Sequence, residues 1–441
     1  MKRIERILCV MTVGCLLAPA WAGAQEQGDF SRENGAYVER IDREIKAGKR
    51  GTLTLSADRG SITVAAWDRD VVRVGVQKKA EVFTEGEARA IFRDFELQIV
   101  REGKNVRIRA RSQSDRRIKS MNVKFALTVP SVYHVDLSTH GGGITVDDLE
   151  GNVKAHTAGG GIKVGHIKNG SVDIHTAGGG LTILGIQNGD CRARTSGGGI
   201  RVGRVSGNLE VNTSGGSISI EQAGGELRAE TAGGGITVDE GGRDLLVKTA
   251  GGGIKVGKAG GRVDASTAGG SIKIGPSTGN VRARTAGGSI EIDQSQAEVD
   301  AETSGGGIRI SGSGGPVKVS TAGGSIKVTG ARGYIEAMTA GGSVEAELVV
   351  SDRSIDTHCR LETAGGDITL RLPGDLAATV DAVLEISKRA KEDYRIYSDF
   401  PLTIKGEGTD RITGHGEING GGDPISLSTR DGDIRIQKLE K

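Results

Sequence analysis

The chain has 441 residues, of which 73 are glycine and only 3% are aromatic, and its formal net charge is +2. Collagen is excluded because glycine does not recur at every third position, and a flexible linker is excluded because β-branched residues alternate regularly between the glycines. The balance of acidic and basic residues argues against nucleic acid and against anionic membrane surfaces as partners.

The first residues of the chain predict an export signal. Lys2 and Arg3 provide a positive start, residues 7–17 are apolar, and a run of small residues ends at Ala24, after which we expect cleavage. The apolar stretch is too short to cross a bilayer as a helix, and no later segment has the required length of apolar sequence. We therefore expect no transmembrane segment, and an exported protein in the periplasm or at the surface of a bacterium.

Cys15 permits a second interpretation of this region, in which a lipid anchors the protein. The small residue Gly14 precedes the cysteine, as lipidation requires, but Thr12 stands where a leucine is usual. Both alternatives stay open at this point.

Residues 25–130 predict an N-terminal, β-rich cap with short helices. Helices are expected from Ala36 to Ala47 and from Glu85 to Phe95. Five of the six phenylalanines lie in this section, which sets it apart from the rest of the chain. Strands are expected at Thr52–Ser56, Ser61–Ala66, Val71–Val76, Leu97–Arg101, Val106–Arg111 and Asn122–Val129.

A repeat fills residues 131–372, between Pro130 and Pro373. Each unit carries a threonine followed by Ala-Gly-Gly, Ser-Gly-Gly or a close variant, and these markers are 18 residues apart in nine steps, 19 in two early steps and 24 in the last. Such regularity indicates a repeat architecture. The markers are Thr139, Thr157, Thr176, Thr195, Thr213, Thr231, Thr249, Thr267, Thr285, Thr303, Thr321, Thr339 and Thr363.

Within one unit, two short strands alternate between apolar and polar residues. Ile162 and Val164 are expected to face inward in the first strand, and Val172 and Ile174 in the second. A single unit cannot bury these residues, but stacked units create one continuous core and two parallel sheets. The sequence therefore predicts an all-β fold, a parallel β-solenoid of 18-residue, Gly-rich coils.

A column of outward-facing residues provides a check on this register. The middle residue of the second strand alternates in the sign of its charge from unit to unit, with one neutral break and no like-charged neighbours. Opposite charges on adjacent strands are favourable and like charges are unfavourable, so the alternation indicates that successive units lie directly over one another. This charge column consists of Lys154, Asp173, Arg192, Glu210, Arg228, Leu246, Asp264, Arg282, Asp300, Lys318, Glu336 and Arg360.

Two further residue types are expected to face the core. The marker threonines share the parity of the core residues in the second strand, so they are expected to point inward at a corner and not to form an exposed, ice-binding array. Cys191 and Cys359 occupy core positions nine units apart. A disulfide requires Cα atoms within about 7 Å, so no bridge within one molecule is expected.

Residues 373–441 predict a C-terminal cap, with two late glycine-rich strands around Ile418 and Ile434. Solenoids need ends that differ from their repeats, because a bare terminal coil exposes sheet edges that recruit other chains. Capping is therefore the expected role of both end sections.

Calcium-binding nonapeptide repeats also carry glycine pairs, but the rest of their pattern is missing here. Counted from Gly159 and Gly160, Ile162 stands where a third glycine is required and Val164 where the ligating aspartate is required. Every unit departs from the pattern in this way, which excludes this type of calcium site.

The longer unit that ends at Thr363 is the one irregularity within the repeat, and it gives a weak candidate surface site. Its inserted residues include the types with which some β-helices cleave polysaccharides. An ordinary solvated loop is the competing interpretation. The candidate residues are Asp352, Arg353, Asp356 and His358.

His156 and His175 occupy the same outward column on adjacent units, so their rings are expected about 5 Å apart. A surface zinc contact needs further ligands, and no third or fourth ligand is evident. The glycine-rich segments do not open helices, so they are not dinucleotide-binding fingerprints. No catalytic Ser-His-Asp set is recognisable, and we expect no catalytic residues, no metal and no cofactor.

Three segments resemble a known family. They are R-G-S-I-T-V-A-A-W-D-R-D-V-V-R-V at residues 59–74, the G-G-x-I-x-V units, and G-E-I-N-G-G-G-D-P-I-S-L-S-T-R-D-G-D-I-R-I at residues 416–436. In these segments the chain is similar to a family of bacterial candidate adhesins built from β-strand repeats, a domain family of unknown function. The resemblance implies a right-handed parallel β-solenoid in the bacterial envelope and brings no catalytic residues to transfer.

Together these patterns favour a non-enzymatic, adhesin-like structural or binding module of the cell envelope, with a protein or a polysaccharide as its partner. The export signal, the stacked units and the lack of a recognisable catalytic constellation lead to this hypothesis. The alternatives are a polysaccharide-active β-helix enzyme and a self-assembling envelope scaffold whose rods join end to end through the sheet edges of the caps.

Overall fold

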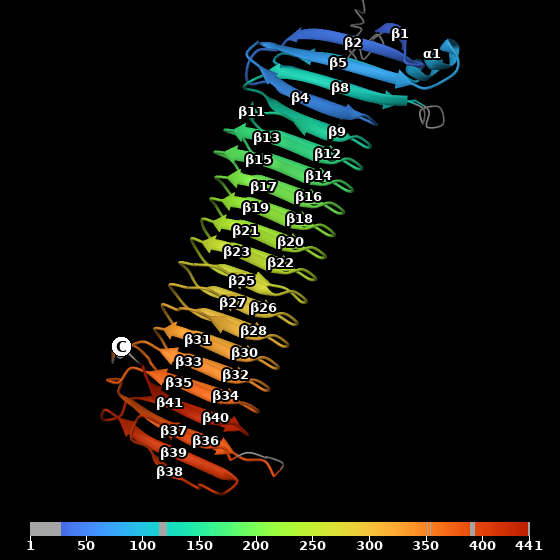
Figure 1. Ribbon diagram of the computed structural model, residues 1–441. Coiled ribbons are helices and arrows are strands. Elements are labelled where there is room, and N and C mark those ends of the chain that lie inside the picture. The colour runs from blue at the N-terminus through green and yellow to red at the C-terminus, as the bar shows by residue number, and fades with distance from the viewer. Residues whose placement is uncertain (1–27, 114–120, 351, 353, 389–392, 440–441) are drawn as a thin grey trace, which may run out of the picture.

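The computed structural model describes residues 28–113, 121–350, 352, 354–388 and 393–439, which form an all-β rod with a single short helix, α1 (Glu85–Arg93) (Figure 1). Two long sheets run along the rod, and the core lies between them. The all-β, solenoid-like prediction is confirmed by the parallel pairing of strands throughout the stacked region. The expected export signal lies outside the described residues.

The two sheets are called sheet A and sheet B here, and their strands follow in spatial order from the N-terminal end of the rod. Sheet A consists of β1 (Asp29–Glu33), β2 (Ala36–Lys46), β5 (Val71–Ala80), β8 (Met121–Pro130), β4 (Ser61–Trp67), β10 (Ile144–Val146) with β11 (Leu149–Glu150), β13 (Ile162–Lys168), β15 (Leu181–Gln187), β17 (Ile200–Val205), β19 (Ile218–Ala223), β21 (Ile236–Gly241), β23 (Ile254–Ala259), β25 (Ile272–Ile274), β27 (Ile290–Ile292), β29 (Ile308–Ile310), β31 (Ile326–Ala331), β33 (Val344–Leu348), β35 (Ile368–Leu372), β41 (Ile434–Lys438) and β37 (Ile396–Ser398). Sheet B consists of β6 (Phe95–Glu102), β7 (Asn105–Ser112), β3 (Thr52–Ala57), β9 (His134–Thr139), β12 (Val153–Thr157), β14 (Val172–Thr176), β16 (Cys191–Thr195), β18 (Leu209–Thr213), β20 (Leu227–Thr231), β22 (Leu245–Thr249), β24 (Val263–Ser266), β26 (Val281–Thr285), β28 (Val299–Thr303), β30 (Val317–Thr321), β32 (Ile335–Thr339), β34 (Cys359–Thr363), β40 (Asp423–Arg430), β36 (Ala378–Glu385), β39 (Arg411–Ile418) and β38 (Thr403–Lys405).

Equivalent residues of successive units lie opposite each other in both sheets. In sheet A, Ile254 of β23 pairs with Ile272 of β25, and in sheet B, Val263 of β24 pairs with Val281 of β26. All four side chains are buried, as the alternation of apolar and polar residues predicts. Each aliphatic residue therefore packs between its own equivalents in the strands on either side, and the core is continuous along the rod.

The marker threonines are buried at a corner of every unit, which confirms that they point inward. Thr213 is typical: its Oγ1 donates to the carbonyl oxygen of Gly198 in the previous unit at 2.7 Å and accepts from the N–H of Gly216 at 3.3 Å. One hydroxyl thus forms hydrogen bonds with two backbone groups of the turns, a carbonyl oxygen and an N–H, that have no partner within the sheets. The threonines link consecutive units as well as turning the chain.

The corner also explains why glycine recurs beside the threonine. A Cβ atom on Gly198 would lie 2.3 Å from the carbonyl oxygen of Gly179 in the previous unit, which is far below van der Waals contact. The backbones of successive turns therefore approach too closely for any side chain, and only glycine fits.

At the N-terminal end, the chain builds the stack out of sequence order. β3 lies between β7 and β9, and β4 lies between β8 and β10, with all of these pairs parallel. The chain thus leaves the stack after β4, adds β7 and β8 beyond it, and returns at β9. Antiparallel strands β6 and β5 then cover this outermost level, so parallel pairing continues through the boundary expected at residue 130.

The expected helix from Ala36 to Ala47 is wrong, because this segment is β2. Its apolar residues recur at helical spacing, but β2 pairs with β5 over ten residues, and this tertiary partner overrides local preference. A hairpin that sequence reasoning missed joins β2 to β1 through Asn34 and Gly35, which have φ values of 49° and 81°. Asn-Gly is the strongest local signal for such a turn. The second expected helix is confirmed as α1, with Thr84 as its N-cap.

The C-terminal end repeats this arrangement in mirror order. β40 lies in parallel between β34 and β36, and β41 lies in parallel between β35 and β37, although β36 and β37 come earlier in the chain. Antiparallel β39 covers β36, and the three-residue strand β38 lies beyond β39. The final residues are therefore inserted between strands that precede them in sequence.

The register predicted from the charge column is confirmed. Asp173 pairs with Lys154 on one side and with Arg192 on the other, and the same one-unit steps continue to Arg360. Some neighbours form ion pairs, such as Arg192 with Glu210 at 2.9 Å. Exposed pairs of this kind contribute at most about 1 kcal/mol each, so the column selects the register more than it stabilises the rod.

Cys191 and Cys359 are free thiols in the core of sheet B, at the same position of β16 and β34. Burial raises the pKa of both thiols to about 12. At neutral pH they are therefore protonated and act as small apolar side chains.

We expect the Thr213→Val substitution to lower the free energy of unfolding by about 1–3 kcal/mol, because it leaves two turn backbone groups without partners while preserving shape. The matched control is Thr237→Val on the outer face of sheet A, which should change it by no more than about 0.5 kcal/mol. Urea unfolding followed by circular dichroism measures both values. Equal midpoints for the two variants would contradict the role assigned to the corner hydroxyl.

We expect neither Cys191 nor Cys359 to react with a thiol reagent at pH 8 in the folded protein, and both to react once urea unfolds it. The reason is that burial keeps the thiols neutral and inaccessible. Release of the coloured product of dithionitrobenzoate measures the reaction. Rapid labelling of the native protein would show that the core opens at these strands.

Candidate functional site

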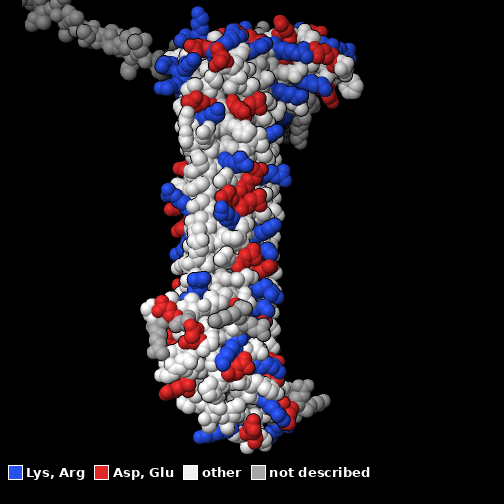
Figure 2. Space-filling model, turned by 60° about the vertical axis from the view of Figure 1, so that its left-hand side comes forward, with Lys and Arg blue, Asp and Glu red and all other residues white. Residues whose placement is uncertain are grey.

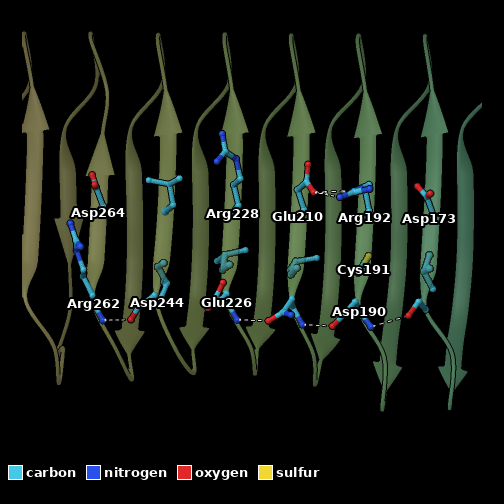
Figure 3. A pocket seen from close by; sticks show the side chains of 17 residues that line it. Asp173, Asp190, Cys191, Arg192, Glu210, Glu226, Arg228, Asp244, Arg262 and Asp264 are labelled. Carbon is cyan, nitrogen blue, oxygen red and sulfur yellow. Dashed lines mark hydrogen bonds and ion pairs between the residues drawn. The ribbon is translucent and has the colours of Figure 1, made fainter.

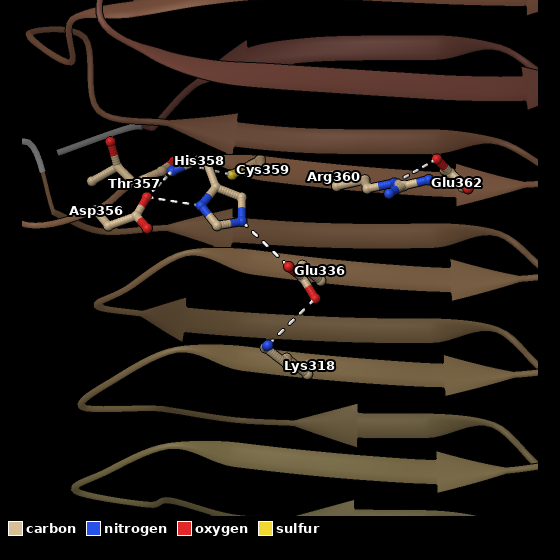
Figure 4. A network of polar contacts seen from close by, with 8 residues as sticks. All are labelled: Lys318, Glu336, Asp356, Thr357, His358, Cys359, Arg360 and Glu362. Atoms are coloured by element: carbon tan, nitrogen blue, oxygen red, sulfur yellow. Dashed lines mark hydrogen bonds and ion pairs between the residues drawn. The ribbon is translucent and has the colours of Figure 1, made fainter.

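The longer unit between β33 and β34 places His358 between two carboxylates (Figure 4). Its Nδ1 lies 2.8 Å from Oδ1 of Asp356, and its Nε2 lies 3.5 Å from Oε1 of Glu336 on the neighbouring strand β32. The hydrogen bond from His358 holds the pKa of the Asp356 carboxyl below its usual value. Two of the four expected site residues are thus in contact, together with a third residue that sequence reasoning had placed only in the charge column.

Tyr334 extends this network along the stack. Its ring is stacked on that of His358, with centroids 4.4 Å apart and an interplanar angle of 14°. Lys318, from the strand on the other side, has its ammonium 5.4 Å from the Tyr334 centroid and 3.8 Å from a Glu336 oxygen. The ring therefore lies between neighbours from adjacent units and is not presented as an open platform of the kind that stacks on a sugar.

The remaining candidate residues do not join this cluster. Asp352 is exposed, and its carboxylate accepts the backbone N–H of Ser354 at 2.9 Å, a bond that lowers the pKa of Asp352. Arg353 lies outside the described residues. The loop is attached to the rod through Thr357, whose N–H and hydroxyl both donate to Asp423 of β40. The contacts of this unit are those of a loop that is pinned to the C-terminal strands.

His156 and His175 lie opposite each other on β12 and β14, as expected, with ring centroids 6.3 Å apart. Among the residues that the structure describes, no group of three or more histidine, cysteine or acidic side chains is arranged to hold a metal ion. The pair alone offers two ligands, fewer than a zinc site uses.

A groove of about 820 Å³ lies on the outer face of sheet B and runs along the rod axis across β14 to β24 (Figure 3). One wall is the charge column from Asp173 to Asp264. The opposite wall is formed by the residue that precedes each strand, and Asp190, Glu226 and Asp244 belong to it. The residues that begin each strand, Cys191 among them, lie between the walls, but their side chains are buried in the core, so the floor of the groove is strand backbone.

Backbone contacts hold the second wall in place. Asp190 Oδ1 accepts the N–H of Asn208 at 2.8 Å, Asn208 Oδ1 accepts the N–H of Glu226 at 3.0 Å, and Asp244 Oδ1 accepts the N–H of Arg262 at 3.0 Å. Each of these three side chains thereby bonds to the backbone of the next unit, 18 residues further along the chain. These side-chain-to-backbone bonds hold the wall in place from one unit to the next.

The first wall carries ion pairs. Glu210 accepts from Arg194 at 2.6 Å and from Arg192 at 2.9 Å, and these hydrogen bonds lower the pKa of the Glu210 carboxyl. The Cys191 thiol lies in the core beneath the groove, and burial raises its pKa to about 12, so it is no nucleophile at neutral pH. The groove therefore offers charged and hydrogen-bonding groups at every unit and is suited to binding along its length.

Sequence reasoning did not identify the groove. A signal was present, because short polar residues recur directly before the first core residue of the second strand in several consecutive units. Such residues favour side-chain bonds to nearby backbone, and this property could have indicated an ordered wall. The hollow itself depends on how far the side chains of two columns extend, which the repeat pattern does not encode.

Among the described residues, no helix is long and apolar enough to cross a membrane. No curated relative matches the sequence. Three solved structures are similar at low identity. A candidate cell adhesion protein from Clostridium sporogenes is 6% identical, with 91% of this chain and 100% of that chain covered and a TM-score of 0.17, and a candidate adhesin from Bacteroides fragilis is 13% identical, with 91% and 97% covered and a TM-score of 0.20. A candidate lipid-binding protein from Parabacteroides distasonis is 15% identical, with 68% of this chain and 96% of that chain covered and a TM-score of 0.21.

The family model for Toastrack DUF4097 matches the chain twice, over residues 53–245 and over residues 236–437. The two matches meet at β21 and the start of β22, where strands pair without interruption from β20 to β24. Two copies of the family pattern thus lie in one continuous stack. The matches span most of the sequence and bear out the expected resemblance. The chain belongs to the Toastrack DUF4097 family.

Proposed function

We propose that the protein is an exported, non-enzymatic module of the bacterial cell envelope, adhesin-like in character, that binds an extended protein or polysaccharide along the groove of sheet B. The observation that carries this proposal is the groove itself, because its walls repeat the same kinds of polar contact over successive units. Weak contacts repeated along one ligand add up to useful affinity without a deep pocket.

The distribution of charge supports a long, shallow contact. Figure 2 shows acidic and basic side chains interspersed along the visible face of the rod. A surface of mixed sign has no bulk attraction for nucleic acid or for anionic lipid. Recognition on such a surface depends on matching individual charges and hydrogen bonds in sequence along the rod.

The finer organisation of the chain belongs to the same proposal. Residues 1–24 would be a cleaved signal peptide, the 18-residue units would be the coils of the solenoid, and residues 25–130 and 373–441 would cap its ends. Support for the caps comes from antiparallel strands β6 and β39, which cover the outermost parallel strands. Caps of this kind limit pairing of the sheet edges with other chains.

A photo-reactive benzoylphenylalanine at position 226, in the groove wall, is expected to cross-link the protein to a partner in intact cells. The same residue at position 237, on the outer face of sheet A, is the matched control and should give no adduct. Gel shifts and mass spectrometry measure the products. Equal yields at both positions, or none at 226, would contradict binding in the groove.

Neutralising the wall should weaken this contact without disturbing the fold. The substitutions Asp190→Asn and Asp244→Asn keep the oxygen that accepts the backbone N–H. The combined variant therefore loses two negative charges and keeps both hydrogen bonds. Two lost contacts of up to about 1 kcal/mol each predict an affinity that is lower by at most about thirtyfold. Asp239→Asn with Glu240→Gln, both exposed on sheet A, provides a control of equal charge that should retain the cross-link.

A further inference from the structure

The charge column changes phase at one point. From Lys154 to Arg228 the signs alternate, beginning and ending with a positive residue. Unbroken alternation would place an acid at position 246 and a base at 264, but the chain has Leu246 and then Asp264. Beyond the break the alternation resumes with opposite phase. The signs on one side of Leu246 are therefore the inverse of those at equal distance on the other side.

We propose that this face of sheet B binds a second copy of the chain, with the two rods antiparallel and related by a twofold axis that passes Leu246. The inference rests on the proposed binding role of sheet B and names its partner. Every pair of charge-column residues that the axis brings together has opposite signs, and each of these pairs occurs twice in such an interface. The pairs are Arg228 with Asp264, Glu210 with Arg282, Arg192 with Asp300, Asp173 with Lys318, and Lys154 with Glu336.

The column permits only this register among its near neighbours. If one rod slides by a single unit, Arg228 meets Arg282 in one direction and Glu210 meets Asp264 in the other. If it slides by two units, Asp264 or Arg228 lies on the axis and meets its own copy. Like charges that meet along the column are unfavourable and disfavour these registers relative to the one centred on Leu246. With Leu246 at the centre, an apolar side chain meets its own copy instead.

The geometry of the sheet supports this arrangement. Leu246 is half-buried and is paired in register with Arg228 and Asp264, so these two lie at equal distances from the axis. Charged side chains of the column remain accessible: the exposed fraction of the side chain is 28% for Glu210, 52% for Arg192 and 54% for Arg228. The ion pair of Arg192 with Glu210 in one rod would face the ion pair of Arg282 with Asp300 in the other. Each charge would then have a partner of opposite sign both within its own rod and across the interface.

The flanking residues make the contact weak and sensitive to salt. The same axis brings Arg194 opposite Glu302 and Glu226 opposite Arg262, which is favourable. It also brings Asp244 and Lys248 opposite their own copies, and Asp190 opposite Glu298, at the rim. The combined Asp190→Asn and Asp244→Asn variant, which should bind a different ligand in the groove more weakly, should therefore strengthen the association of two rods. The two grooves face each other beside the contact and leave room for water to bridge polar groups. We therefore expect an association that strengthens at low ionic strength.

Sedimentation velocity on the mature full chain at low salt tests the proposal. The wild-type protein is expected to dimerise, with dissociation on addition of 1 M NaCl. Leu246→Glu and Leu246→Arg should each weaken the dimer at least tenfold, because like charges then meet on the axis. An equimolar mixture of these two variants should dimerise better than either alone, because opposite charges meet instead. Thr237→Glu and Thr237→Arg, on sheet A of the same unit, should leave the dimer unchanged.

The mixture separates this proposal from a general loss of folding, since two misfolded variants would not restore each other. Circular dichroism of each variant checks the fold independently. A wild-type monomer at all concentrations, or a mixture no stronger than its components, would overturn the twofold axis at Leu246. If the purified rod is a monomer while position 226 still cross-links to another molecule in cells, the groove keeps its proposed function and the second copy is excluded as its partner.

Discussion

The rod depends on a single constraint, which is that each unit must lie directly over the last. Only this register brings Ile254 over Ile272 and Val263 over Val281, and only then does an aliphatic face too small to fold alone become part of a long core. The corner enforces the same register through hydrogen bonds, because the Thr213 hydroxyl reaches a carbonyl of the previous turn. Apolar packing and turn hydrogen bonds therefore specify one arrangement, and this agreement between levels is what gives a sequence a unique fold.

The two ends show how a stack of open sheets is closed. At the N-terminal end the chain first forms the level of β3 and β4, then adds the outer level of β7 and β8, and returns at β9 to the inner side of β3. At the C-terminal end it forms the outer level of β36 and β37 first and then fills the level that it had skipped with β40 and β41. β3 and β40 are thus each held between strands that are distant in sequence. This interleaving ties the first and last levels to segments that fold as antiparallel strands, so fraying at an end requires the loss of a larger structure. A simple terminal coil would have only one neighbour.

Much of this architecture could be predicted from the sequence, because a repeat reports the same physical environment many times. The register, the inward threonines and the buried cysteines follow from parity alone. The two ends of the rod were harder to predict. The apolar residues of β2 have helical spacing, but pairing with β5 makes this segment a strand, and no local sequence pattern reveals that partner. The candidate site was only partly predictable for the same reason. Asp356 and His358 were found by type, but Glu336 and Tyr334 join them through stacking across units.

The charges on sheet B bear on two separate requirements: favourable pairing within one rod, and a single register between two rods. Within one rod, alternation avoids like-charged neighbours, and an unbroken series would satisfy that requirement equally well at every unit. Such a series would also be ambiguous toward a second rod, because shifts of two units would be equivalent along most of its length. A neutral residue at which the alternation reverses still avoids like-charged neighbours within one rod, since Leu246 separates Arg228 from Asp264. The reversal also makes the registers between two rods distinguishable, because the column now has a single centre at Leu246. The proposed contact with a second rod therefore explains the break at Leu246, whereas charge pairing within one rod does not require it.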